Sequence, residues 1–197
     1  MQLYGQGRIS RKRAEFLCGF TNLASAPFLL GVVGNTLFGK TAFGWRLIAL
    51  QAVCGLLTAG VLYACLRPAC KGVCGERKTP ASLLFHITSA TYTALEVGGM
   101  LIFFGAAGDC LQTLLRLQGV PAVLMGGFWE FSAGCGKAAE LGGKAGAVLA
   151  GVSVGFSGLC VLGQVAAVTK GKLSLAPYLG GKLIQTALMG VGLLLFS

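Results

Sequence analysis

The stretch GAVLAGVSVGFSGLCVLGQVAAVT, from Gly146 to Thr169, decides the fold that this sequence predicts. It lies between Lys144 and Lys170 and carries no charged residue. At about 1.5 Å of rise per residue, a helix of this length crosses the roughly 30 Å hydrocarbon core of a bilayer. The stretch therefore predicts a membrane-spanning segment.

A helical wheel separates two kinds of residue within this stretch. The polar arc contains Ser153, Ser157, Cys160 and Gln164, and the opposite side contains Gly151, Gly155 and Gly158. Small residues let another helix approach closely and polar side chains facing lipid are costly, so both faces should be covered. The glycines also predict a break between Gly155 and Gly158, so the wheel holds only within each half.

The composition of the whole chain is that of an integral membrane protein. Of the 197 residues, 55% are hydrophobic and 11% are charged, whereas soluble domains have about 25% charged residues. The 32 glycines against five prolines predict close helix packing and broken helices. The length suits one all-α bundle of about five or six hydrophobic passes.

The net charge of +10 comes from basic residues in the short gaps between apolar runs. The positive-inside rule then predicts that residues 1–15 and the loop 67–80 are cytoplasmic. No aromatic-interleaved basic groove or RNA-binding signature is present, so nucleic acid is not expected as a partner. The expected surroundings are a lipid bilayer and a small-molecule solute.

Neither the eight cysteines nor the single histidine predicts a metal site. Cys65, Cys70 and Cys74 cluster near a basic loop, but C-x3-C without a second pair is a weak metal motif. No Ser/His/Asp set exists that would suggest an enzyme. We therefore expect no metal, no cofactor and no catalytic residue.

The first apolar segment, residues 16–39, should be broken. Pro27 removes a helical donor and restrains Ala26 away from helical angles, which predicts a break between Asn22 and Pro27. Broken backbone at membrane depth is tolerated only where it faces protein or water. Asn22 and Ser25 are therefore either ligand-site residues or caps of a helix that begins at Pro27, and both can hold.

Three further segments complete the expected bundle. Residues 47–66 form the plainest transmembrane helix, and residues 81–107 form an amphipathic or bundle-lining lead-in followed by an apolar body. Glu96 between these two parts lies either at the surface or inside the bundle. A short last crossing is expected over 183–196. The residues expected at its entrance are Tyr178 and Lys182.

Residues 120–136, VPAVLMGGFWEFSAGCG, are too short for a comfortable crossing and predict a re-entrant hairpin with Glu130 in an apolar setting. An ionisable group at membrane depth generally marks a pathway or a ligand partner. The alternatives are a Glu130 paired with Lys137 or placed at the interface. A hairpin places Lys170 and Lys172 on the cytoplasmic side, whereas a crossing places Lys137 and Lys144 there.

Three sequence blocks together resemble the sporulation integral membrane protein YlbJ family, whose members carry the nucleoside-recognition or Gate membrane domain. The blocks are residues 20–31, residues 127–134 (GFWEFSAG) and residues 155–164 (GFSGLCVLGQ). Two positions depart from the family pattern: Ala26 separates Ser25 from Pro27, and Ser157-Gly158 replaces a glycine pair. Family members are longer, and the resemblance covers only their C-terminal part.

The resemblance implies a transporter-like inverted repeat, here incomplete. It assigns residues 16–66 to the C-terminal part of a first repeat and residues 81–197 to a Gate-like domain. Homodimerisation or a companion N-terminal half would supply the remainder. The substrate-binding residues that it implies, together with the polar pattern, are Asn22, Ser25, Glu130, Ser157 and Gln164.

The leading functional hypothesis is a permease, or a permease subunit, in a bacterial cell membrane with a cytoplasmic N-terminus. The resemblance implies endospore-forming bacteria, membranes around the forespore, and a dipicolinate-like anion or a nucleoside-like molecule as solute. Lys137 or Lys144 could attract an anion, while Glu130 would bind a cation or a proton. The alternative is a non-transporting membrane scaffold, or a truncated gene product.

Overall fold

The computed structural model describes residue 4 and residues 7–68 and 83–196, and every regular element in these ranges is a helix. Most of the loop 67–80 lies outside the described residues, as do Cys70, Cys74 and the side chain of His86. The helices are α2 (Arg11–Thr21), the π-helix η1 (Phe28–Leu37), α3 (Thr41–Leu66), α4 (Leu83–Leu114), α5 (Val120–Trp129), α6 (Phe131–Leu141), α7 (Gly143–Phe156), α8 (Gly158–Thr169) and α9 (Ala176–Phe196).

Four helical stretches in the described ranges are long and apolar enough to cross a membrane. They are Thr41–Leu66, Ile87–Leu114, Gly143–Thr169 and Ala176–Phe196. Large apolar side chains such as Leu56 and Ile102 are exposed on their outer faces, 72% and 76% respectively. Lipid can cover these side chains, so the fold is the expected all-α membrane bundle.

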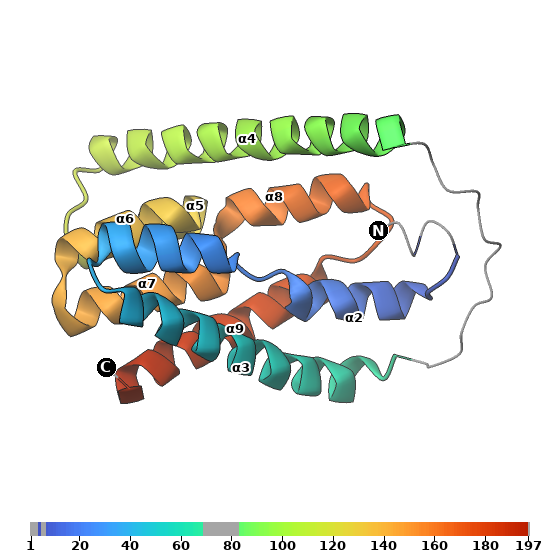
Figure 1. Ribbon diagram of the computed structural model, residues 1–197, viewed down its shortest axis with the longest axis horizontal. Helices are drawn as coiled ribbons and strands as arrows, with labels where there is room; N and C mark the ends of the chain where they lie inside the picture. Colours follow the sequence, from blue (N-terminus) through green and yellow to red (C-terminus); the bar gives the residue numbers. More distant parts are fainter. Residues whose placement is uncertain (1–3, 5–6, 69–82, 197) are drawn as a thin grey trace.

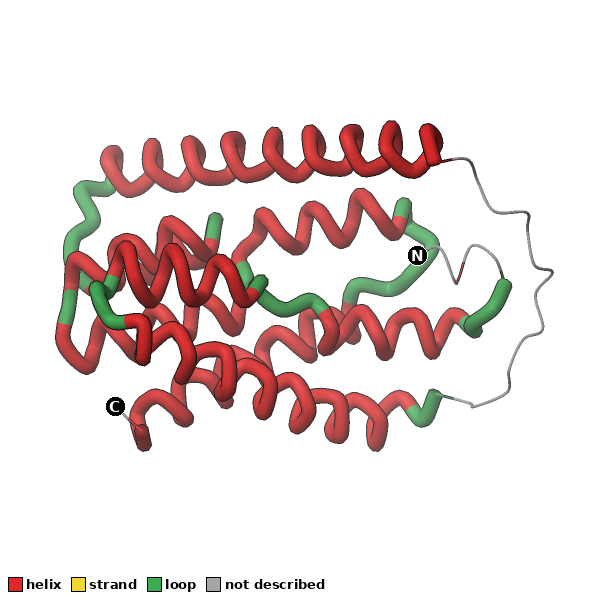
Figure 2. Tube along the Cα trace, in the orientation of Figure 1, coloured by secondary structure: helices red, strands yellow, loops and turns green. Residues whose placement is uncertain are grey.

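The chain path contains two broken passes that run in opposite directions (Figure 1). In the first half, α2 and η1 together traverse the bundle with a break between them, and α3 returns. In the second half, α7 and α8 traverse it the opposite way with a break between them, and α9 returns (Figure 2). This arrangement is an inverted pair of broken-helix units, which is typical of transporter folds.

Both helix breaks lie where the sequence predicts them. The first falls between Thr21 and Ala26, because α2 ends at Thr21 and the next helical residue is Ala26. The second falls at Ser157, which has the left-handed dihedral angle φ of 68°. Ala26 and Pro27 are already helical, so Pro27 lies in the first turn of the second helix and does not force Ala26 out of helical angles. The glycines on either side of Ser157 permit the second break.

Residues 120–141 form a helical hairpin: α5 begins, and α6 ends, at the same end of the bundle (Figure 1). The limbs meet through glycine, since a Cβ built on Gly134 would lie only 2.5 Å from the Gly127 Cα. The hairpin also determines where the following loop lies: Lys170 and Lys172 lie at the bundle end that holds the N-terminal segment. Residues 120–136 therefore form a hairpin and not a single crossing.

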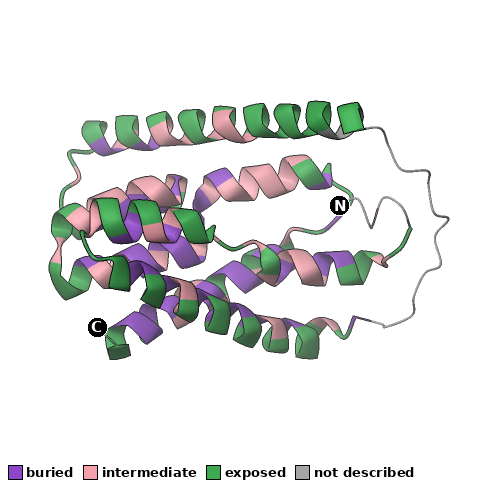
Figure 3. Cartoon of the chain, viewed as in Figure 1, coloured by how far each residue is buried: buried purple, intermediate pink, exposed green. Residues whose placement is uncertain are grey.

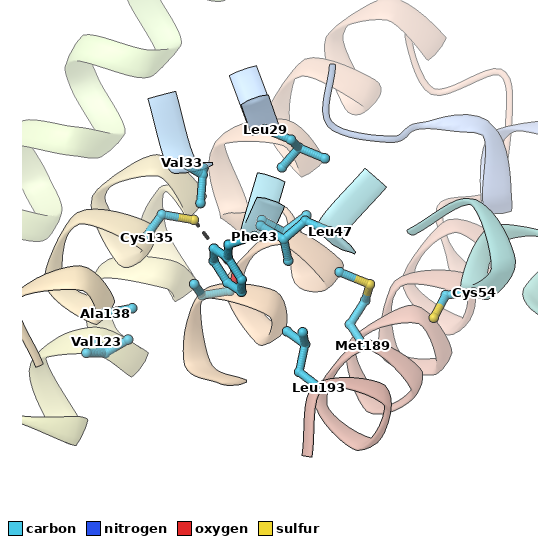
Figure 4. Packing of buried hydrophobic residues seen from close by; sticks show 12 residues of the cluster. Leu29, Val33, Phe43, Leu47, Cys54, Val123, Cys135, Ala138, Met189 and Leu193 are labelled. Carbon is cyan, nitrogen blue, oxygen red and sulfur yellow. Dashed lines mark hydrogen bonds between the residues drawn. The ribbon is translucent and has the colours of Figure 1, made fainter. Parts of the chain in front are cut away.

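The core lies between η1, α3, α6, α7 and α9 (Figure 3). Leu29, Leu47 and Met189 belong to the buried cluster there, and the Cys135 thiol donates to the Ala150 carbonyl at 3.8 Å (Figure 4). Glycine controls the close approach of α7 to α9. A Cβ on Gly155 would lie 2.8 Å from the Thr186 Cα, so the glycine face that the wheel predicts does pack on another helix.

Helix α4 does not line the bundle as the sequence suggests. Its residues 87–96 are exposed, and it contacts mainly α5 and α8 along the outer edge (Figure 3). Glu96 is exposed within α4 and not enclosed by the other helices. The bundle-lining alternative is wrong. The hydroxyls of Thr88, Thr91 and Thr93 bond back to carbonyls of the same helix, as with Thr88 to Leu84 at 2.9 Å, and so need no bundle partner.

The end of α2 is tied to the turn before α9 by Glu15. Its Oε1 accepts from the Ser174 N–H at 2.8 Å and from Arg11 Nε at 2.8 Å. Burial raises the pKa of Glu15, but the Ser174 hydrogen bond and the Arg11 guanidinium outweigh it, so the net pKa lies below its ordinary value of 4.5. The folded state therefore favours the carboxylate.

A first prediction concerns this contact. Replacing Glu15 with glutamine should lower the thermal midpoint of the detergent-solubilised protein at pH 7, because the charged acceptor is lost. Folding lowers the pKa of Glu15. The difference in thermal midpoint between the variant and the native chain should therefore be present at pH values above 4.5 and vanish as the pH falls through the lowered pKa of the folded state. Glu140→Gln is the control. The Glu140 side chain is 72% exposed and its ion pair with Lys137 is long, at 3.9 Å, so its loss should cost little. A midpoint difference for Glu15→Gln that does not change with pH would contradict the assignment.

Candidate functional site

Three breaks in the helical backbone meet near the centre of the bundle, and we call this place the junction. Its backbone parts are residues 22–25 between α2 and η1, Glu130 between α5 and α6, and Ser157 between α7 and α8. Gly158 sits against the hairpin, since a Cβ there would lie 3.1 Å from the Trp129 carbonyl oxygen and 3.2 Å from the Glu130 Cα. The side chain of Lys182, on α9, joins the first and third breaks.

Lys182 is 2% exposed, and each of its three ammonium donors has an acceptor. Its Nζ donates to the Asn22 carbonyl oxygen at 2.5 Å, to Ser157 Oγ at 2.9 Å and to Gln185 Oε1 at 3.1 Å. An ammonium has three donors, so all of them have acceptors. In the part of the chain that the structure describes, no carboxylate forms an ion pair with it.

Side chains from two other helices bind one carbonyl in the last turn of α2 and one in the break that follows it. Gln185 Nε2 donates to the Phe20 carbonyl at 3.2 Å, and Gln51 Nε2 donates to the Ala24 carbonyl at 3.0 Å. A helix C-terminus carries a partial negative charge, so the cation of Lys182 is favoured beside it. The first break is therefore held open by α3 and α9.

Ser157 combines an unusual backbone conformation with a polar contact. A left-handed conformation costs a non-glycine residue roughly 1–2 kcal/mol, and here it ends α7 with the Ser157 N–H bonded to the Ser153 carbonyl at 2.9 Å. The Ser157 hydroxyl lies 3.2 Å from the Val154 carbonyl, to which it donates, and accepts from Lys182. Strain of this kind persists where the surroundings fix it, and it occurs often at ligand sites.

Glu130 is 3% exposed and begins α6. Its Oε2 accepts from the Ala133 N–H at 2.9 Å and from the Ser132 hydroxyl, which fits a carboxylate at the positive end of a helix. Its other oxygen, Oε1, is buried and has no hydrogen-bond partner among the described residues. Lys137 pairs with Glu140 and not with Glu130, so the ion-pair alternative is wrong.

No known protein-family model, curated protein or solved structure matches this chain. The site must therefore be judged from its own residues. Within the described ranges, no three His, Cys, Asp or Glu side chains gather into a group that could hold a metal ion.

The structure brings some of the predicted residues together and separates others. Asn22, through its carbonyl, and Ser157 share Lys182, and Glu130 lies beside the same break. Ser25 is exposed and caps η1, with its Oγ 3.4 Å from the Phe28 N–H. Gln164 is about 9 Å of helix rise beyond Gly158, and its Nε2 contacts Cys160 Sγ at 3.4 Å.

Lys182 is the residue that sequence reasoning placed wrongly. Because it follows the start of α9 closely, it reads as an interfacial anchor, and so does Tyr178. Both are only 2% exposed. The available signal was the polar face formed by Lys182, Gln185 and Thr186 at helical spacing. A charge that shares a face with an amide suits the bundle interior better than the membrane surface.

The junction is closed. The space between Leu23, Gln51, Val154 and Lys182 is too small to admit a water molecule. Any solute that binds here must first separate the broken elements. Gly134 packs on Gly127 of the other limb and on Ser153 of α7, so the hairpin and α7 form one closely packed unit.

Proposed function

We propose that the chain is a multi-pass permease, or one subunit of a permease, that moves a small solute through the junction. The observation that carries this proposal is the buried Lys182, whose ammonium joins the breaks of two oppositely directed helical passes. Ionisable groups at membrane depth are costly and generally mark a pathway. The resemblance to the YlbJ family and its Gate domain supports the same function.

Lys182 favours an anionic solute in the junction, provided that the buried Glu130 beside it is protonated or binds a cation. Lys182 is a buried cation without a carboxylate partner among the described residues, whereas Lys137 and Lys144 lie away from the junction. A carboxylate of a dipicolinate-like anion could replace the Asn22 and Ser157 acceptors around Lys182. Nucleoside-like solutes, which are neutral, would use Gln185, Gln51 and Ser157 instead.

Orientation follows from the two ends of the bundle. α3 and α8 both end where the N-terminal segment lies (Figure 1). That end holds seven described basic residues against five at the opposite end: Arg8, Arg11, Lys12, Arg13, Arg67, Lys170 and Lys172 against Lys40, Arg46, Arg116, Lys137 and Lys144. The positive-inside rule therefore supports a cytoplasmic N-terminus in a bacterial cell membrane, including membranes around a forespore. The long exposed face of α4 leaves room for a second copy or a companion half.

Uptake into proteoliposomes tests the proposal. The purified chain, alone and together with a companion Gate-type half, should take up dipicolinate or nucleosides above empty liposomes. Uptake that saturates with solute concentration is the expected result. Absence of uptake in both arms, with the protein correctly inserted, would overturn it.

A second prediction concerns Glu130. Its unpaired Oε1 suits a proton or a cation that moves with the solute. Glu130→Gln keeps an oxygen for the Ala133 N–H but removes the charge, so uptake should persist and lose its response to a proton or sodium gradient. In the native chain, one coupled proton should give about tenfold accumulation per unit of pH difference. Glu96→Gln, at an exposed position, is the control, and a variant that still follows the gradient would exclude this role.

The closed junction favours one alternative, a non-transporting scaffold. In that case the three hydrogen bonds of Lys182 only fasten helices together, and no solute enters. The scaffold predicts that variants of Lys182 and Glu130 reduce the amount of assembled protein in the membrane and change no flux. Abundance and uptake measured on the same variants separate the two functions.

A further inference from the structure

A groove of about 1240 Å³ opens at the end of the bundle opposite the N-terminal segment. It lies where η1 turns into α3, where α6 turns into α7, and where α9 ends (Figure 1). The groove is separate from the junction, and its lining shares no residue with the closed space around Lys182.

Three cations from different segments line the groove, namely Lys40, Arg46 and Lys144. All three are exposed, and no carboxylate in the described part of the chain forms an ion pair with any of them. The nearby Glu140 is directed to Lys137. The mouth of the groove therefore carries uncompensated positive charge.

The wall on α3 extends into one bilayer leaflet. Its residues Ala42, Arg46, Ala49, Leu50 and Val53 recur at helical spacing on one face. From Arg46, at the charged mouth, to Val53 the helix rises about 10 Å, and half of the roughly 30 Å hydrocarbon core is about 15 Å. The wall thus leads from the charged mouth about two thirds of the way through one leaflet.

The inner part of the groove is apolar. Leu193 and Phe196 of α9 and Ala147 of α7 face the α3 wall across it. Trp45, which is 60% exposed beside Arg46, lies at the level where indole rings settle at the membrane surface. Cations at the surface end and apolar walls below match a molecule with an anionic head and a hydrocarbon tail.

We propose that this groove binds a phospholipid with an anionic phosphate headgroup, with the phosphate on Lys40, Arg46 and Lys144 and an acyl chain along α3. Basic pockets between membrane helices bind such lipids by the same combination of charge and apolar surface. A small solute would leave the apolar wall unused. A second copy docked by two-fold symmetry would bring the three cations against the same three cations.

Native mass spectrometry of the detergent-purified full chain tests the proposal. Phosphatidylglycerol and phosphatidylcholine with identical acyl chains are the two probes. The triple variant Lys40→Gln, Arg46→Gln, Lys144→Gln should weaken phosphatidylglycerol binding by roughly 100-fold, given the contribution of each basic residue near an anionic lipid. Phosphatidylcholine binding should change little.

Two controls keep the result interpretable. Lys137→Gln with Arg116→Gln removes charge outside the groove and should leave lipid binding unchanged. Ala49→Trp fills the wall at an exposed position and should reduce binding of both lipids without altering charge. Inorganic phosphate at millimolar concentration should not compete. Equal binding of the two lipids to the native chain, an unchanged triple variant, or competition by phosphate alone would each overturn the proposal.

Discussion

Replacing Lys182 with methionine is expected to reduce solute uptake by roughly 10- to 100-fold while changing the stability of the bundle only slightly. The side chain keeps its length and loses its charge and its three donors. Hydrogen bonds to charged groups contribute about 1.5–3 kcal/mol, so losing one to an anionic solute should lower its affinity by roughly 10- to 100-fold. Uptake at low solute concentration falls by the same factor.

The small effect on stability follows from two opposing terms. Methionine leaves the Asn22 carbonyl, Ser157 Oγ and Gln185 Oε1 without a donor, and each buried unsatisfied group costs about 1–3 kcal/mol. It also removes a lone buried ammonium, whose desolvation costs several kcal/mol. These terms have similar size and opposite sign. A residue retained in spite of such a desolvation cost is more readily explained by function than by stability.

Thermal stability in detergent and uptake in liposomes should be measured on the same preparation. Lys172→Met is the matched control, because Lys172 is exposed in the turn before α9 and should affect neither quantity. A Lys182→Met chain that loses about as much stability as a truncated core residue, about 2–5 kcal/mol, would favour the scaffold. So would a variant that retains full uptake.

The backbone breaks could be predicted because their causes are local. Pro27 suits the first turn of the helix that follows the first break, and the glycines around Ser157 permit the left-handed residue between α7 and α8. The hairpin follows from two short glycine-bearing limbs on either side of Glu130. Each of these signals is contained within about ten residues of sequence, the range over which backbone propensity acts.

The partners of Lys182 could not be predicted in the same way. Its position depends on the carbonyl of Asn22, 160 residues away along the chain, and therefore on how α2 packs against α9. The exposure of α4 could not be predicted either. Its own carbonyls satisfy its threonine hydroxyls whether or not another helix covers them, so the sequence does not show which case holds. Polar pattern identifies residues that need partners, and only the packed structure shows which partner each one has.

Gly134 provides the sharpest test of the hairpin itself. A Cβ at this position would lie 2.5 Å from the Gly127 Cα and 2.7 Å from Ser153 Oγ, so the two limbs of the hairpin and α7 could not all keep their places. Overpacking of this kind costs about 1–3 kcal/mol. We expect Gly134→Ala to lower the thermal midpoint and to reduce uptake, because the hairpin tip at Glu130 moves with the limb.

Gly136→Ala is the matched control, two residues further along the same helix. A Cβ there meets nothing within 4 Å. Alanine is favoured over glycine in a helix interior by up to about 1 kcal/mol, so this variant should be slightly more stable than the native chain. The same substitution should thus have opposite signs at neighbouring positions of α6. If both variants shift the midpoint in the same direction, the glycine contact between α5, α6 and α7 does not hold the hairpin against the junction.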